Sequence, residues 1–309
     1  MPASPLEADH LQPVSAGVLA ALVGFASSFA VVLTGLQAVG ASRAEAASGL
    51  LALCVAQALG ILWLTRRHRI PLVLAWSTPG AALLASSGAV DGGWPAAVGA
   101  FLVVGALILL TALWPRLGEL IASIPTPIAQ AMLAGVLLEI CVEPVRVLLH
   151  HPWLVSPVLV VWVVLLRLRP RAAVPGAFVA TMVVVAVYLL GHDPGHLALA
   201  PHVAWTRPVF GWQAVIGLAV PLYVVTMASQ NVPGVAVLAS FGYRVPWREA
   251  MTVTGLGTLA GATAGGHAVN LAAITAAMAA SPEAHPDKER RWIAAYTAGW
   301  TYLVLAGVS

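Results

Sequence analysis

The chain consists of long apolar runs separated by short polar segments. Most runs hold 17 to 26 residues, the length that an α-helix needs to cross ~30 Å of hydrocarbon, and they lack the ~10-residue alternation of an outer-membrane barrel. We therefore predict an all-α polytopic membrane protein with eleven spans. The predicted spans are residues 14–39, 45–64, 71–88, 94–114, 126–148, 152–168, 173–191, 212–239, 249–263, 264–281 and 292–309.

The third span carries a helix-start signal near the middle of the membrane. In the stretch WSTPGAALLASSG, Ser77 or Thr78 can cap a helix, and Pro79 suits its first position because the missing N–H has no partner there. Extended at ~3.3 Å each, residues 71–76 cover ~20 Å, and residues 79–88 as a helix add ~15 Å. We predict an extended segment followed by a half-helix.

The tenth span repeats this plan in the stretch GGHAVNLAAITAAMAAS. Gly265 and Gly266 permit an extended backbone, Asn270 is a suitable cap, and residues 271–280 form the predicted second half-helix. Non-helical backbone at membrane depth must be hydrogen-bonded by protein, so we expect the two extended pieces to pair with each other. The alternative is that the proline and the glycines are ordinary kinks in continuous helices.

Composition excludes a soluble globule of this size. The chain is 60% hydrophobic and only 9% charged, with a mean hydropathy of +0.90, which leaves too little polar surface to cover it. Cys54 and Cys141 fall inside apolar runs without metal-ligand or CxxC spacing, so neither a disulfide framework nor a metal site is indicated.

The basic residues predict the orientation of the spans. Twelve of the fifteen lie in even-numbered loops, namely Arg66, Arg67, Arg69, Arg116, Arg167, Arg169, Arg171, Arg244, Arg248, Lys288, Arg290 and Arg291. Only Arg43, Arg146 and Arg207 lie in odd-numbered loops. By the positive-inside rule, the even loops and the N-terminus are cytoplasmic. Topology thus explains the high isoelectric point, and nucleic-acid binding is not indicated.

The predicted topology gives the third and tenth spans opposite directions. Their half-helices then start near the midplane from opposite faces, and both N-termini point at one central place. Unpaired N–H groups and the helix dipole favour an anion there, such as a carboxylate. Two broken spans in corresponding halves are typical of transporters built from inverted repeats, in which span 1 corresponds to span 8 and span 3 to span 10.

One histidine and one carboxylate lie deep inside predicted spans and are candidates for proton coupling. His267 sits at the break of the tenth span, and Glu139 lies deep in the fifth. Protonated His267 could pair with a substrate carboxylate; the alternative is a neutral histidine that bonds the broken backbone. Glu139 could face a cleft or bond a neighbouring helix. Gln230 and Asn231, beside Ser229, could hold a carboxylate or bond between helices.

No enzyme class is indicated by the motifs. The sequence lacks HExxH, GxSxG and P-loop motifs, paired-carboxylate spacing, and the aspartate clusters of CDP-alcohol or prenyl transferases. No cofactor is indicated.

Three stretches resemble the signature sequences of the benzoate/proton symporter family (BenE). They are TMASQNVPGVAVL at 226–238, GGHAVNLAAITAA at 265–277 and WSTPGAALL at 76–84, and the similarity covers the whole chain. The family is distantly similar to the uracil and sulfate transporters with 7+7 inverted repeats. The resemblance implies a first repeat at 1–191, with core spans 1–4 and gate spans 5–7. It also implies an incomplete second repeat at 212–309, with core spans 8–11. The last apolar run reaches Ser309 without a polar flank, so we expect that spans 12–14 are missing.

The resemblance implies a proton-coupled importer of benzoate or a similar aromatic monocarboxylate, working by alternating access in the cytoplasmic (inner) membrane. The expected substrate-binding residues are Ser77, Thr78, Ser229, Gln230, Asn231, His267 and Asn270. Trp76 offers a ring on which an aromatic substrate could stack. Transport of nucleobases or inorganic anions is the alternative among carriers, and an anion channel is the alternative class. The partners are the substrate, H⁺ and the lipid bilayer, and a homodimer is one option for the assembly.

Overall fold

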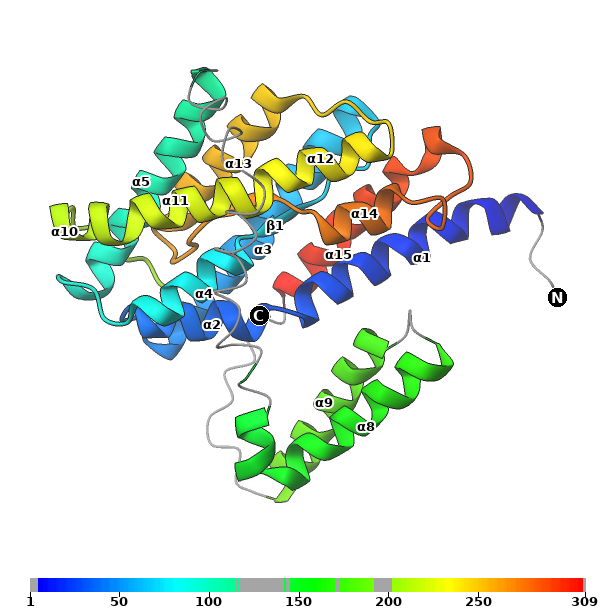
Figure 1. Cartoon of the computed structure of the whole chain (residues 1–309), viewed down its shortest axis with the longest axis horizontal. Helices are drawn as coiled ribbons and strands as arrows, with labels where there is room; N and C mark the ends of the chain where they lie inside the picture. The colour runs from blue at the N-terminus through cyan, green and yellow to red at the C-terminus, as the bar shows by residue number, and fades with distance from the viewer. Residues whose placement is uncertain are drawn as a thin grey trace.

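The chain folds into long helices around two short strands (Figure 1). The computed structural model describes residues 5–114, 116, 142, 145–169, 173–191 and 202–307. In chain order the elements are α1 (Pro5–Ala26), α2 (Phe29–Ala38), α3 (Arg43–His68), β1 (Leu74–Trp76), α4 (Thr78–Ser87), α5 (Gly93–Leu113), α8 (Pro152–Leu168), α9 (Ala173–Gly191), α10 (Trp212–Ala214), the π-helical turn η2 (Val215–Ala219), α11 (Val220–Thr226), the π-helical turn η3 (Met227–Asn231), α12 (Val232–Ser240), α13 (Trp247–Ala262), β2 (Val269–Leu271), α14 (Ile274–Ala280), the 3₁₀ turn η4 (Lys288–Arg290) and α15 (Trp292–Ala306).

Within the described residues, four helical stretches are long and apolar enough to cross a membrane: Leu11–Ala38, Arg43–His68, Gly93–Leu113 and Trp212–Ser240. The protein is therefore a mostly helical, multi-pass membrane protein, as the apolar runs predict. Elements α8 and α9 form a hairpin beside the main bundle, and Phe178 of α9 meets Phe29 of α2 edge-on at 6.4 Å between ring centroids (Figure 1). Most of the run predicted at 126–148, including Glu139, lies outside the described residues.

The two broken spans pair with each other, as predicted. Strands β1 and β2 are antiparallel, with Leu74 opposite Leu271, Ala75 opposite Asn270 and Trp76 opposite Val269. Backbone hydrogen bonds from Ser77 N to Ala268 O (3.0 Å) and from Ala272 N to Val73 O (2.9 Å) extend the pairing at both ends.

Side chains satisfy the N–H groups of β2 that face away from β1. Alternate backbone groups of a strand point away from its partner, and no water is available at membrane depth to bond them. The Thr258 Oγ1 of α13 accepts from Val269 N at 2.9 Å, and the Asn231 Oδ1 of η3 accepts from Leu271 N at 2.8 Å. The strand pair is therefore bonded into the bundle on the β2 side by α13 and η3.

Each half-helix follows its strand within three residues, but the tenth span departs from the prediction. Ser77 caps α4, whereas Asn270 does not cap α14. Asn270 stays in β2, and α14 starts only at Ile274, after Ala273, with no side-chain cap. The pairing with β1 and the bond from Leu271 N to Asn231 hold residues 269–271 extended, which delays the helix and shortens it to seven residues.

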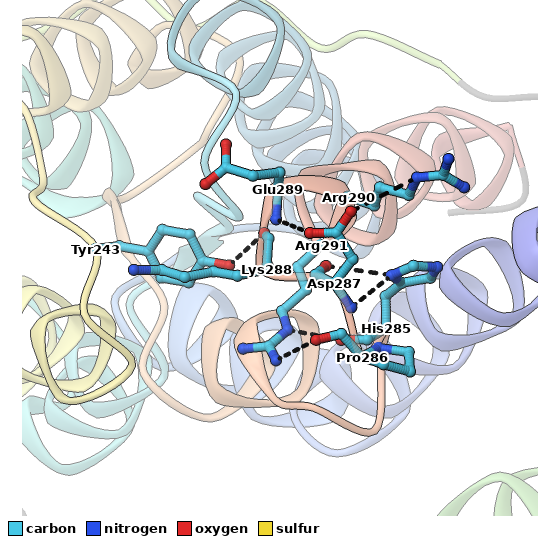
Figure 2. Close-up of polar contacts among 8 residues, drawn as sticks. All are labelled: Tyr243, His285, Pro286, Asp287, Lys288, Glu289, Arg290 and Arg291. Carbon is cyan, nitrogen blue, oxygen red and sulfur yellow. Dashed lines mark hydrogen bonds and ion pairs between the residues drawn. The ribbon is translucent and has the colours of Figure 1, made fainter.

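Arg291 closes the other end of α14 (Figure 2). Its Nη1 donates to Ala280 O at 2.9 Å, its Nε donates to His285 O at 2.7 Å, and its Nη2 donates to Pro286 O at 3.2 Å. A cation bonded to the last carbonyl groups of a helix is favoured by the helix dipole. The buried guanidinium thus fixes the turn between α14 and α15.

Three of the predicted even-numbered loops meet at one end of the bundle. The contacts are Arg67 Nε to Glu249 Oε2 at 3.1 Å, the Arg69 guanidinium 4.4 Å from the Trp292 ring centroid, and Lys288 Nζ to Gly242 O at 2.7 Å. Beside Lys288, Tyr243 donates its phenol to the Lys288 carbonyl at 2.8 Å, and burial raises the pKa of that phenol (Figure 2). The second, eighth and tenth loops thus lie together, as the distribution of basic residues predicts.

Replacing Thr258 with valine tests the bond to the strand edge. Thr258→Val keeps the shape of the side chain but leaves Val269 N–H without its acceptor, so the free energy of unfolding should fall by about 1–3 kcal/mol. The control is Thr252→Val on the same helix, where the hydroxyl bonds only the Arg248 carbonyl. Thermal unfolding in detergent should show a lower midpoint for Thr258→Val alone; equal midpoints would contradict the assigned role.

Candidate functional site

Ser77 is the junction at which the two broken spans are joined. Its Oγ accepts from Gly80 N at 3.1 Å, which caps α4, and also accepts from Thr226 Oγ1 of α11 at 2.8 Å. Its carbonyl lies 2.9 Å from His267 Nε2. Ser77 is fully buried and contacts Gly80, Thr226 and His267, so it acts here as a cap and a connector.

His267 is fully buried two residues before β2 and is not part of the lining of the cavity described below. Because a carbonyl only accepts, Nε2 must carry the proton in the bond to Ser77. Nδ1 is buried and has no hydrogen-bond partner among the described residues. The ring also meets Phe101 of α5 edge-on, with centroids 6.3 Å apart. Of the two alternatives from the sequence, this geometry matches the neutral histidine that bonds the broken backbone.

The polar residues of η3 have different environments although they are consecutive. Asn231 is buried, donates from Nδ2 to Met227 Sδ at 3.0 Å and accepts from Leu271 N. Ser229 is buried, and its hydroxyl has no partner in the described part of the chain. Gln230 points elsewhere and lines a cavity. Of these residues, only Gln230 is therefore placed to meet a ligand in this conformation.

Asn270 is buried in β2 opposite Ala75. Its Nδ2 donates only to the neighbouring Leu271 carbonyl at 3.1 Å, and its Oδ1 has no partner within the described residues. The side chain is thus available for a further hydrogen bond, although it does not line the cavity described next.

A cavity of about 210 Å³ lies where both half-helices begin. Thr78 at the start of α4 and Thr275 in the first turn of α14 contribute to its wall. Its other polar or aromatic lining includes Ser28, Trp76, Gln230 and Tyr302. The Thr275 hydroxyl is buried without a partner among the described residues. The cavity therefore combines hydrogen-bonding groups with aromatic surface.

The aromatic side of the cavity is held in a fixed arrangement. Trp76 Nε1 donates to Ser28 Oγ at 2.9 Å, and the Trp76 ring meets Phe25 and Tyr302 edge-on, at 5.8 and 6.3 Å between centroids. Gly24 of α1 lets Tyr302 approach, since a Cβ at that position would lie 2.3 Å from the phenol oxygen. A planar apolar ligand group would meet pre-formed aromatic surface.

Four polar or aromatic lining residues are absent from the predicted site: Ser27, Ser28, Thr275 and Tyr302. Thr275 belongs to the stretch that marks the broken span, so its hydroxyl could have been selected as a candidate. Tyr302 lies in the eleventh span, and no local pattern there indicates a site. The predicted site residues thus divide: Thr78 and Gln230 line the cavity, whereas Ser77, Ser229, Asn231, His267 and Asn270 are buried and do not line it.

Sequence comparisons identify the family of this chain and two similar proteins. The family model described as "Benzoate membrane transport protein" (BenE) matches residues 8–309. The chain is 39% identical over 295 residues to the inner membrane protein YdcO of Escherichia coli, an alignment that covers 95% of this chain and 74% of that protein. It is 28% identical over 304 residues to the benzoate membrane transport protein of Acinetobacter baylyi, which covers 96% of this chain and 75% of that protein.

Stability measurements can test whether the Asn231 amide bonds the backbone and the Gln230 amide faces the cavity. Asn231→Leu removes the acceptor of Leu271 N–H and should lower the free energy of unfolding by about 1–3 kcal/mol. Gln230→Leu, one residue earlier, should change it by less than about 0.5 kcal/mol because that side chain faces a cavity. Thermal unfolding of the two variants in the same detergent provides the measurement; a larger loss for Gln230→Leu would reverse the assignment.

Proposed function

The chain belongs to the family of benzoate membrane transport proteins, and from that premise we propose that it is a proton-coupled importer of benzoate or a similar aromatic monocarboxylate. The observation that carries the proposal is the cavity of about 210 Å³ at the starts of the two half-helices. It has hydroxyl and amide groups on one set of elements and aromatic rings on another, which matches a ligand with a carboxylate and a ring. The relative from Acinetobacter baylyi is named for benzoate transport.

In the proposed complex, the carboxylate lies against Thr78, Gln230 and Thr275. The Thr275 hydroxyl has no partner among the described residues, so it is free to donate to a carboxylate oxygen. The N-terminus of the ten-residue α4 adds a partial positive charge. Hydrogen bonds to a charged group contribute about 1.5–3 kcal/mol each. The ring then packs against Trp76 and Tyr302. Ser77, Ser229, Asn231, His267 and Asn270 form the layer behind, from which a change of conformation could bring them to the substrate.

We further propose a 7+7 inverted-repeat architecture, with residues 1–191 as the first repeat and residues 212–309 as part of the second. In support, two strand-and-helix units (β1–α4 and β2–α14) are paired antiparallel. In such a repeat, α3 corresponds to α13 and α5 corresponds to α15. The packing of α3 on α15 should then have a counterpart in the packing of α13 on α5, and both contacts are present. Spans 1–4 and 8–11 would form the core, and spans 5–7 the gate, whose movement against the core gives alternating access.

A proton as the coupling ion has a simple energetic basis. Moving a lone carboxylate into a cell with a negative interior costs ~2.3 kcal/mol per 100 mV, and one accompanying proton cancels this term. We propose His267 as the proton carrier because its Nε2 bonds Ser77, the residue that caps α4. Protonation of Nδ1 would therefore change the hydrogen bond to Ser77 and, through Ser77, the start of α4 at the cavity wall. Glu139 is the second candidate. The basic loops that meet at one end would face the cytoplasm, with the N-terminus, in the inner membrane.

Replacement of the Thr275 hydroxyl tests the substrate site. Thr275→Val should raise the KM for benzoate about tenfold or more, because a charge-assisted hydrogen bond is lost, while the thermal midpoint changes little. Thr301→Val on α15, whose hydroxyl bonds only the Thr297 carbonyl, is the matched control. Uptake of radiolabelled benzoate into proteoliposomes gives the KM. Counterflow would distinguish a carrier from an anion channel, and uptake of uracil or sulfate without benzoate would favour the alternative substrates.

The proton role is tested separately with His267→Gln. Glutamine can still donate to the Ser77 carbonyl but does not titrate, so benzoate counterflow should persist while an imposed pH gradient no longer drives accumulation. Gradient-driven accumulation that survives in this variant would move the proton to Glu139. His267→Ala, which also removes the hydrogen bond, should lose both activities.

A further inference from the structure

A second cavity in the described part of the chain lies away from the starts of the two half-helices. It is a groove of about 540 Å³ between α3 and α13, closed at one end by the segment around Trp205. Ser48 contributes the only hydroxyl among the described residues that line it, and that hydroxyl already donates to Ala264 O at 2.8 Å. The rest of the lining is aliphatic or aromatic. Apart from the indole N–H groups of Trp63 and Trp205, the lining residues therefore offer little hydrogen bonding to a small hydrophilic ligand.

Small residues keep the groove open where the two helices face each other. A Cβ on Gly257 of α13 would lie 3.6 Å from the Ala56 Cβ of α3, an ordinary contact distance, so the two helices face each other here through small residues. Larger residues, including Leu59 and Leu256, stand at the sides and are 55% and 51% exposed. From Ser48 to Trp63 the groove follows α3 for ~22 Å, about three-quarters of the ~30 Å hydrocarbon thickness. This length accommodates one acyl chain of a single leaflet.

The end of the groove at Trp63 is positively charged. Arg66 follows Leu59 by seven residues and Trp63 by three, so it continues the same face of α3, and it is exposed. The Arg67 guanidinium lies 5.7 Å from the Trp63 ring centroid. Arg248 is exposed at the start of α13. The acidic residue at this end, Glu249, is bonded by Arg67 at 3.1 Å and lies 2.8 Å from His68 Nε2.

We propose that this groove binds one anionic phospholipid, with an acyl chain along α3 and α13 and its phosphate at Arg66 and Arg248. The apolar lining and the length fit an acyl chain, the tryptophan marks the level of the headgroups, and the arginines complement a negative headgroup. The site lies between α3 and α13, where Gly60 and Gly257 of its lining face Leu74 of β1 and Val269 of β2, and it shares no lining residue with the proposed substrate cavity. Lipid binding there would place an anionic lipid against the two helices that enclose β1 and β2.

Native mass spectrometry of the detergent-purified protein tests the proposal by titration with phosphatidylglycerol and, separately, phosphatidylcholine of the same acyl chains. We expect the first phosphatidylglycerol to bind at least tenfold more tightly than phosphatidylcholine. The double variant Arg66→Gln with Arg248→Gln should lose this preference and keep the phosphatidylcholine affinity. Ala260→Phe, which fills the groove from an exposed position, should weaken both lipids about tenfold or more.

The matched control is Ala106→Phe, at an exposed position of α5 that does not line the groove, and it should bind both lipids as the parent does. Equal affinity of the parent protein for the two lipids would overturn the headgroup assignment. Unchanged binding by Ala260→Phe would overturn the groove as the site. Binding of glycerol phosphate as strong as that of the lipid would also overturn it, because the acyl chain would then contribute nothing.

Discussion

The structure depends on one constraint: backbone N–H and C=O groups at membrane depth must be hydrogen-bonded by protein, since the hydrocarbon offers no partner. A span that is interrupted at its middle exposes several such groups at once. Here two interrupted spans bond each other through β1 and β2, and side chains from neighbouring helices take the N–H groups of the outer edge. The result ties the third, eighth, ninth and tenth spans into one unit, because removing any of them would leave backbone groups unpaired.

This constraint also creates the cavity. Once the strands occupy the interior, the half-helices α4 and α14 must start at their ends, and their first turns face α1 and α15. Neighbouring polar residues then divide between two tasks. Ser77 bonds backbone and Thr78 faces the cavity; Asn231 bonds backbone and Gln230 faces the cavity. Because adjacent residues point in different directions, one serves the fold while the next is exposed to a ligand.

This division explains how far the sequence could predict the molecule. The lengths of the apolar runs predict the helices, and Ser77 with Pro79 correctly predicts the start of α4, because both signals are local. The pairing of the extended pieces is also predictable, since they have no other partners at that depth. The predicted start of α14 was wrong. Asparagine is a favourable capping residue, but Asn270 is held in extended backbone by β1 and by Asn231, which lies about forty residues away in the chain. Tyr302 reaches the cavity only through packing that Gly24 permits, and no local pattern encodes that contact.

The position of His267 links the fold to the proposed mechanism. Its Nε2–H is used by the Ser77 carbonyl, and Nδ1 meets no acceptor among the described residues, so this arrangement suits the neutral ring. A second proton on Nδ1 would be buried without a hydrogen-bond acceptor, a costly state unless an acceptor moves into place. The arrival of a carboxylate or a shift of the neighbouring elements would supply one. Because the ring bonds the residue that caps α4, protonation and the shape of the cavity wall would change together, and coupling would need no direct contact between the histidine and the substrate in this conformation.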